Sequence, residues 1–255
     1  MLPGPVYLLS DAHLGVAPAE TERELVSFLR HLPADAGALV INGDLFDFWF
    51  EWRHVIPRTG IRVLGELGRL VDGGLPVLWI AGNHDCWGGE VLRRDIGVTY
   101  HEGPWRGTLG GWDTLIEHGD GLREKEDAPY RRLRAVLRHP WAIRAYRWLH
   151  PNWGTALALR SSHTSRNMRP GDGGEGLRRV AHARLGAADA PQLLVFGHSH
   201  VSTLERVGRG VFANPGAWLD APQLLRVSPE GVALCRWDGH SVRQEQALPP
   251  YGPGR

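Results

Sequence analysis

The chain has 255 residues, with a hydrophobic content of 42% and a charged content of 22%, which are ordinary values for a globular protein. It has no apolar run of the ~20 residues that a membrane span needs. Two cysteines, Cys86 and Cys235, exclude a disulfide framework, and the N-terminus lacks the pattern of a signal peptide. We therefore expect a protein of the reducing cytoplasm.

Charge is unevenly distributed, although the formal net charge is only +1. Residues 122–184 contain 14 Lys and Arg against 5 Asp and Glu, and the rest of the chain is acidic. An acidic body with one basic segment suits metal binding together with capture of an anionic substrate. From charge alone, a solvated arginine-rich helical face explains the segment equally well.

Strands and helices alternate in the first half of the predicted structure. Apolar runs predict buried strands at residues 5–10, 38–42 and 76–81, and helical spacing predicts helices at 20–32 and 60–71. Because this rhythm implies parallel pairing through right-handed crossovers, we expect a parallel sheet.

The second half begins with a predicted strand at residues 113–117 and continues into a basic helical segment, residues 122–192. Helices are predicted within that segment at 127–137, 142–149 and 175–184. A strand is predicted at 192–197, and short strands separated by Gly or Pro then predict a meander on one side of the fold, at 203–207, 210–214, 224–227 and 232–237. Residues 248–255 are typical of a loose tail. We expect one domain over residues 1–255, with 122–192 as an insert.

Polar groups directly follow five of the predicted strands. These motifs are Asp11-Ala12-His13, Gly43-Asp44-Leu45-Phe46-Asp47, Gly82-Asn83-His84-Asp85, His118-Gly119-Asp120 and Gly197-His198-Ser199-His200. Carboxylate, amide and imidazole groups gathered at strand ends suit two divalent metals, with Asp44 as a bridging ligand. Each motif alone is more often a helix cap, a polar turn or a surface His pair. The ordered set favours a two-metal site that hydrolyses phosphate esters or anhydrides.

This ordered set resembles the calcineurin-like metallophosphoesterase superfamily over residues 5–220, including Asn214-Pro215-Gly216. The resemblance implies an α/β fold, a β-sandwich of mixed sheets flanked by helices. It also implies two ligand sets that share Asp44, one of Asp11, His13, Asp44 and His200, the other of Asp44, Asn83, His118 and His198. A metal-bound hydroxide would attack phosphorus, His84 would stabilise charge or protonate the leaving group, and Asp85 would orient His84. Asp47 and Asp120 would be supports. The resemblance favours Mn²⁺, although the ligand types also accommodate Zn²⁺, Fe or Co²⁺.

Within the superfamily, the chain is similar to the UDP-2,3-diacylglucosamine pyrophosphatase group of lipid A synthesis. Trp49, the run His150-Pro151-Asn152-Trp153-Gly154 and Ser165-Arg166 carry this similarity. It implies an anionic nucleotide-linked lipid or sugar substrate, a lid formed by the insert over acyl chains, and weak contact with the inner face of the membrane. It also implies substrate contacts for Arg160 and Arg166. Many members of this group have Arg in place of His84, whereas His is the general phosphodiesterase pattern.

Two other functions remain open. The first is a general phosphodiesterase or nuclease, although the chain contains no recognised nucleic-acid-binding module and no nucleic-acid partner is expected. The second is a non-catalytic scaffold of the same fold. A scaffold that had lost its chemistry would be expected to lack ligands, whereas this chain retains all seven.

Overall fold

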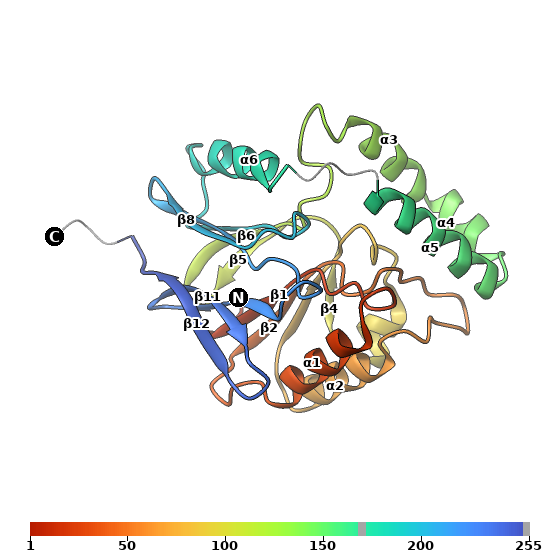
Figure 1. Cartoon of the computed structure of the whole chain (residues 1–255), viewed down its shortest axis with the longest axis horizontal. Coiled ribbons are helices and arrows are strands. Elements are labelled where there is room, and N and C mark those ends of the chain that lie inside the picture. The colour runs from red at the N-terminus through yellow and green to blue at the C-terminus, as the bar shows by residue number, and fades with distance from the viewer. Residues whose placement is uncertain (168–171, 252–255) are drawn as a thin grey trace.

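Two β-sheets face each other and are covered on their outer sides by helices, as Figure 1 shows. A computed structural model describes the backbone of residues 1–167 and 172–251, and the side chains of 1–160 and 172–251. The predicted α/β class, with mixed sheets flanked by helices, is confirmed. The predicted loose tail, residues 248–255, falls partly outside the described residues, which end at residue 251.

The first sheet has seven strands in the order β12-β11-β10-β1-β2-β3-β4. Its parallel half consists of β1 (Val6–Leu9), β2 (Ala38–Asn42), β3 (Val77–Ile80) and β4 (Thr99–His101). The segments between these strands contain α1 (Ala19–Arg30), α2 (Ile61–Asp72) and the π-helix η1 (Val91–Asp95). The predicted parallel pairing of the first three strands is confirmed, while β4 was not predicted.

The second sheet has five strands in the order β5-β6-β7-β9-β8. These strands are β5 (Trp105–Leu109), β6 (Trp112–Ile116), β7 (Leu193–Val195), β8 (Thr203–Val207) and β9 (Gly210–Asn214). Antiparallel strands complete the first sheet, namely β10 (Gln223–Ser228), β11 (Gly231–Trp237) and β12 (Val242–Leu248). The prediction of one meander on one side is wrong, because β8 and β9 lie in a different sheet from β10 and β11. The spacing of strands along the sequence predicts which strands follow one another, but it does not predict which sheet each strand joins.

Alternation along the strands explains the layers. In β1, Val6 and Leu8 pack in the cluster between the two sheets, whereas Tyr7 and Leu9 pack in the cluster that includes α1 and α2. Successive side chains of a strand point to opposite faces, so a strand buried on both faces reads as a continuous apolar run. On the far side, α6 (Glu175–Leu185) packs against Phe196 and Phe212 of the second sheet.

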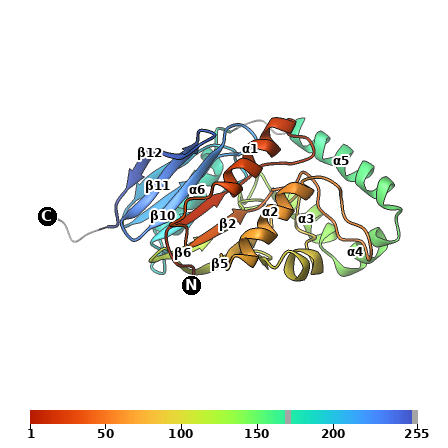
Figure 2. The same cartoon turned by 90° about the horizontal axis from the view of Figure 1, so that it is seen from below.

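Three further helices extend beyond the sheets, as Figure 2 shows from below. They are α3 (Ala128–Leu137), α4 (Pro140–Arg147) and α5 (Pro151–Asn167). Aromatic residues that follow β2 connect them to the body, since Phe50 packs on Tyr146 with ring centroids 4.8 Å apart. The Nε1–H of Trp52 also donates to the carbonyl of Leu149. The sequence prediction missed α5, because Gly154 and a polar stretch interrupt its helical pattern.

Two glycines allow the ends of β2 and β3 to approach closely. Gly43 has φ +78°, and a Cβ added there would lie 2.7 Å from the Cα of Gly82 and even closer to Nδ1 of His118. A Cβ on Gly82 would overlap the carboxylate of Asp44. Only glycine therefore fits at these two strand exits.

We predict that Gly43→Ala destabilises the protein by more than about 1 kcal/mol, because the positive φ and the steric overlap both oppose the new methyl group. Gly65→Ala in α2 is the matched control, since its Cβ meets nothing within 4 Å. That substitution is expected to stabilise the helix by about 0.5–1 kcal/mol. Urea unfolding of the three proteins measures both effects, and equal stability of Gly43→Ala and the unaltered chain would contradict the prediction.

Candidate metal centre

All seven predicted ligands lie in loops that follow β1, β2, β3, β6 and β7. Six of them fall into groups of three residues whose donor atoms all lie within 4.8 Å of one another. One group is Asp11, His13 and His200, and another is Asp44, His118 and His198. A third group consists of His13, Asp44 and His84, so it shares His13 with the first group and Asp44 with the second. The seventh, Asn83, directly precedes His84.

The backbone is unusual at these positions. Among the described residues, those other than glycine with positive φ are Asp11, His13, Asp44, His198 and His200. All five belong to the predicted ligand set. Residues other than glycine seldom adopt this conformation, and such strain is concentrated at functional sites. The fold therefore bends the chain sharply in order to aim these side chains.

The two carboxylates are buried, and each has one oxygen held by the protein. Oδ2 of Asp11 accepts hydrogen bonds from the hydroxyl of Ser10 and from the backbone N–H of His198, the latter at 3.0 Å. Oδ1 of Asp44 accepts from the backbone N–H of His84 at 2.9 Å. The other oxygens, Oδ1 of Asp11 and Oδ2 of Asp44, face the imidazole rings.

Backbone carbonyl groups orient two of the rings. Nδ1 of His118 lies 2.8 Å from the carbonyl oxygen of Asn42, and Nδ1 of His84 lies 2.8 Å from that of Asp47. Because a carbonyl only accepts, each Nδ1 carries the proton and each Nε2 faces the carboxylates. Nε2 of His118 is 3.1 Å from Oδ2 of Asp44, and Nε2 of His84 is 4.0 Å from it. Asp44 thus lies at the centre of the cluster.

Asp85 was predicted to orient His84, but its hydrogen bonds support the loop that carries the ring. Its carboxylate accepts from the backbone N–H groups of Leu45 and Gly82 and from the indole of Trp79. These contacts connect the exits of β2 and β3. Burial raises the pKa of Asp85 to about 6, and the charge of Asp44 adds to this rise.

The donor set fits a divalent metal. The buried atoms without a hydrogen-bond partner in the described part of the chain include Oδ1 of Asp11, Oδ1 of Asn83 and Nε2 of His118. Asp11 and His118 belong to groups with metal-binding spacing. Buried polar atoms are normally paired, so a cluster of unpaired acceptors needs a further positive partner. Carboxylate oxygen, amide oxygen and imidazole nitrogen are suitable ligands for divalent first-row metals.

Electrostatics favour ionised carboxylates. Burial acts to raise the pKa of Asp44, but the adjacent His118 and His84 outweigh it and hold that pKa well below its usual range. Burial likewise acts to lower the pKa of His118, yet Asp44 and Asp11 raise it well above the ordinary value. The buried carboxylates are therefore ionised and stabilise positive charge on the groups that they face.

The two predicted substrate-binding arginines belong to α5 and not to these loops. Arg160 is an exposed residue of α5. Arg166 lies outside the residues whose side chains are described. Their roles stay predictions.

Sequence reasoning missed several supports of the site. The hydroxyl oxygen of Ser10 also lies 2.9 Å from the carbonyl oxygen of Asn42, and Oδ2 of Asp220 lies 3.5 Å from Nδ1 of His200. The amide of Asn214 donates to the carbonyl of Gly197 at 2.9 Å. Ser10 and Asn42 are polar residues at the end of apolar runs, and that signal was readable in the sequence. Asp220 has no such signal, because it comes from a distant loop.

Comparison with known proteins agrees with this geometry. The family profile of calcineurin-like phosphoesterases matches residues 4–202. A UDP-2,3-diacylglucosamine hydrolase of Porphyromonas gingivalis is 35% identical over 70% of this chain and 69% of its own length. Proteins of the same name from Nitrosococcus oceani and Neisseria meningitidis serogroup B are 34% and 31% identical. They match 88% and 90% of this chain, and 92% and 97% of their own lengths. The chain belongs to the calcineurin-like phosphoesterase family, whose members are metal-dependent hydrolases.

Proposed function

We propose that this protein hydrolyses the phosphoanhydride of a nucleotide-linked diacylated sugar, as the names of its relatives indicate for those proteins. The observation that carries the proposal is the convergence of carboxylate and imidazole groups from five strand exits on Asp44, among which Oδ1 of Asp11 and Nε2 of His118 are buried without a hydrogen-bond partner. In this proposal one ion is held by Asp11, His13, Asp44 and His200. The other is held by Asp44, Asn83, His118 and His198, and Mn²⁺ is the preferred metal.

The chain's own groups have distinct tasks in this reaction. Two bound divalent ions would supply Lewis acidity towards the phosphoryl oxygens and lower the pKa of a bound water. Asp44 presents Oδ2 to both ligand groups, while the carbonyl of Asn42 keeps Nε2 of His118 free for coordination. Nε2 of His84 is directed at the same centre and can hydrogen-bond a phosphoryl oxygen or protonate the leaving group. Because Nδ1 of His84 already donates to the carbonyl of Asp47, either role requires a second proton on Nε2, which is the imidazolium form.

The outer surface of α3, α4 and α5 supports a lipid-linked substrate. Trp141, Trp148 and Trp153 expose 70%, 91% and 76% of their surface, and exposed Arg144 and Arg147 lie among them. Indole rings with basic neighbours suit the interface of an anionic membrane. No helix in the described part of the chain is both long and apolar enough to cross a membrane. We infer that these three helices form the lid and contact the membrane surface on its cytoplasmic side.

A general phosphodiesterase is the second candidate. His84 favours it, since an imidazole at this position is the pattern of that wider group. Both candidates use the same metal centre, so only the substrate distinguishes them.

We predict that Asp44→Asn lowers the turnover of bis(p-nitrophenyl) phosphate by more than about 100-fold. This loss exceeds the one expected when a residue that only supports a metal ligand is replaced. It should also lower the bound manganese measured by elemental analysis. Asp35→Asn, a change of the same kind at an exposed residue, is the control. Retained turnover in Asp44→Asn would refute the two-metal mechanism.

We predict release of UMP from UDP-2,3-diacylglucosamine in detergent by the manganese-loaded protein. Product identification by mass spectrometry should be run beside a panel of cyclic and linear phosphodiesters. Rapid cleavage of the diesters without release of UMP would establish the second candidate instead.

We predict that Trp148→Ser weakens binding to anionic phosphatidylglycerol vesicles at least about threefold, because an interfacial indole is removed. Ile61→Ser is the control, since Ile61 is 60% exposed on α2. Vesicle sedimentation measures both variants. Equal binding by the two would argue against the inferred membrane face.

A further inference from the structure

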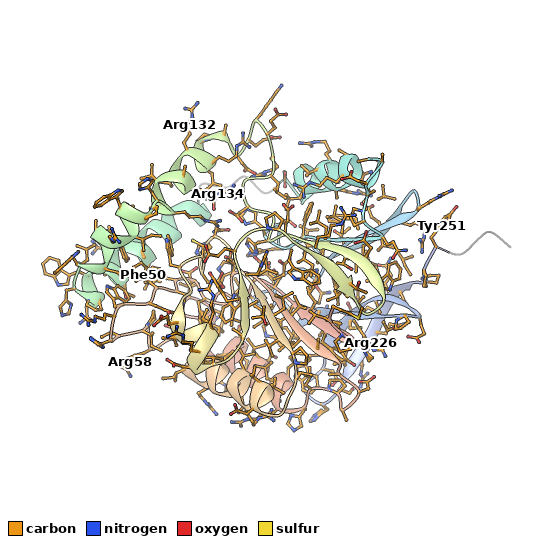
Figure 3. The ribbon with its side chains drawn as sticks, turned by 180° about the vertical axis from the view of Figure 1, so that it is seen from behind. Phe50, Arg58, Arg132, Arg134, Arg226 and Tyr251 are labelled. Atoms are coloured by element: carbon orange, nitrogen blue, oxygen red, sulfur yellow. The ribbon has the colours of Figure 1, made fainter. Side chains whose placement is uncertain are left out.

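Helix α3 has its polar and apolar faces reversed with respect to the body. Leu133 and Val136 expose 52% and 62% of their surface, whereas Arg131, Arg134 and Arg138 are half-buried. A surface helix normally turns its apolar stripe inwards. Figure 3 shows Arg132 on the outer side of α3 and Arg134 on its inner side. Burial of apolar surface therefore does not explain the inner face of this helix.

The inward arginines line a cleft of about 600 Å³, and Arg184 of α6 completes its basic wall. The lining also includes uncharged residues, namely Ala81, Gly103, Pro104, Gly119 and Leu122. This volume lies in the range of small-molecule sites. The cleft borders the metal centre, since His118 contributes to its lining.

Two carboxylates hold three of these arginines in place. Nη1 of Arg184 lies 2.5 Å from Glu117, and Nη1 of Arg134 lies 3.0 Å from Asp120. Arg138 is 3.6 Å from the same Asp120. Four guanidinium groups against two carboxylates leave the cleft with two uncompensated positive charges.

The guanidinium groups have donors to spare. A guanidinium carries five N–H donors, yet the described hydrogen bonds of Arg134 and Arg184 each use Nη1 alone. Nε of Arg138 is buried without a hydrogen-bond partner. Such planar donor edges match the oxygens of a phosphate, and ion pairing fixes them before a ligand arrives.

We propose that this cleft is a second anion site, which binds the phosphate group of a small molecule apart from the metal centre. A phosphomonoester carries close to two negative charges at neutral pH, which equals the uncompensated charge of the cleft. Hydrolysis of a phosphoanhydride by water produces two phosphomonoesters, so the neighbouring reaction releases anions of this class. That release rests on the proposed function, whereas the charge and the unused donors of the cleft do not.

Ala135→Glu tests this site without breaking an ion pair. Ala135 lies on α3 and lines the cleft, so the new carboxylate repels an anion there. Ala183→Glu, on an exposed position of α6 outside the cleft lining, is the matched control. In calorimetric titration of the metal-loaded protein with inorganic phosphate, we expect one event at the metals and one at the cleft. Ala135→Glu should weaken the cleft event at least about tenfold, while Ala183→Glu keeps both.

Further variants separate the cleft from the metals. Asp44→Asn should retain the cleft event, and Arg134→Gln/Arg184→Gln should lose it. Arg132→Gln/Arg179→Gln removes the same charge from exposed positions of the same two helices and should bind as the unaltered chain does. A parallel titration with UMP tells whether a nucleotide binds more tightly than phosphate alone. Unchanged binding by Ala135→Glu, or loss of every event in Asp44→Asn, would overturn the proposal.

Discussion

Two neighbouring carboxylates, Asp11 and Asp44, are buried at the base of the metal centre. Moving a charge out of water costs several kcal/mol, so this arrangement persists only where other groups compensate it. Backbone N–H groups compensate one oxygen of each carboxylate, and imidazole rings face the other. Carboxylates that are held in the ionised form stabilise positive charge at this centre, which is what a cation site requires. This property follows from the carboxylate and imidazole groups of the chain itself.

The strands hold in place the loops that bring these charged groups together. Positive φ at five residues other than glycine costs on the order of 1–3 kcal/mol each, which isolated loops would relax. Here the ladder between β1 and β2 continues into the loops, since Asp11 N–H donates to Gly43 and His13 N–H donates to Asp44. The carbonyl groups of Ser10 and Asp11 in turn accept from Trp218 and Leu219. The register of the strand ends therefore fixes the positions of the predicted ligands.

Much of this architecture was readable in the sequence, for a physical reason. Parallel strands buried on both faces are continuous apolar runs, and each run here ends in a polar motif. β1, β2 and β3 with their ligand loops were therefore predictable. β4 has three residues and β5 carries Gly107 in its interior, so neither shows a strong strand pattern. The division of the later strands between two sheets depends on tertiary pairing that periodicity does not encode.

The orientation of α3 was also beyond sequence reasoning. Its apolar residues predict a helix, and the usual rule places Leu133 and Val136 against the core. The rule fails because Asp120, buried at the exit of β6, attracts Arg134 and accepts a hydrogen bond from Tyr130 at 2.7 Å. An ion pair next to the metal loop thus decides which face of the helix turns inwards, and the apolar face is left outside. The same contact accounts for a basic cleft on one side of α3 and an apolar surface on the other, so the loop that follows β6 and helix α3 are parts of one arrangement.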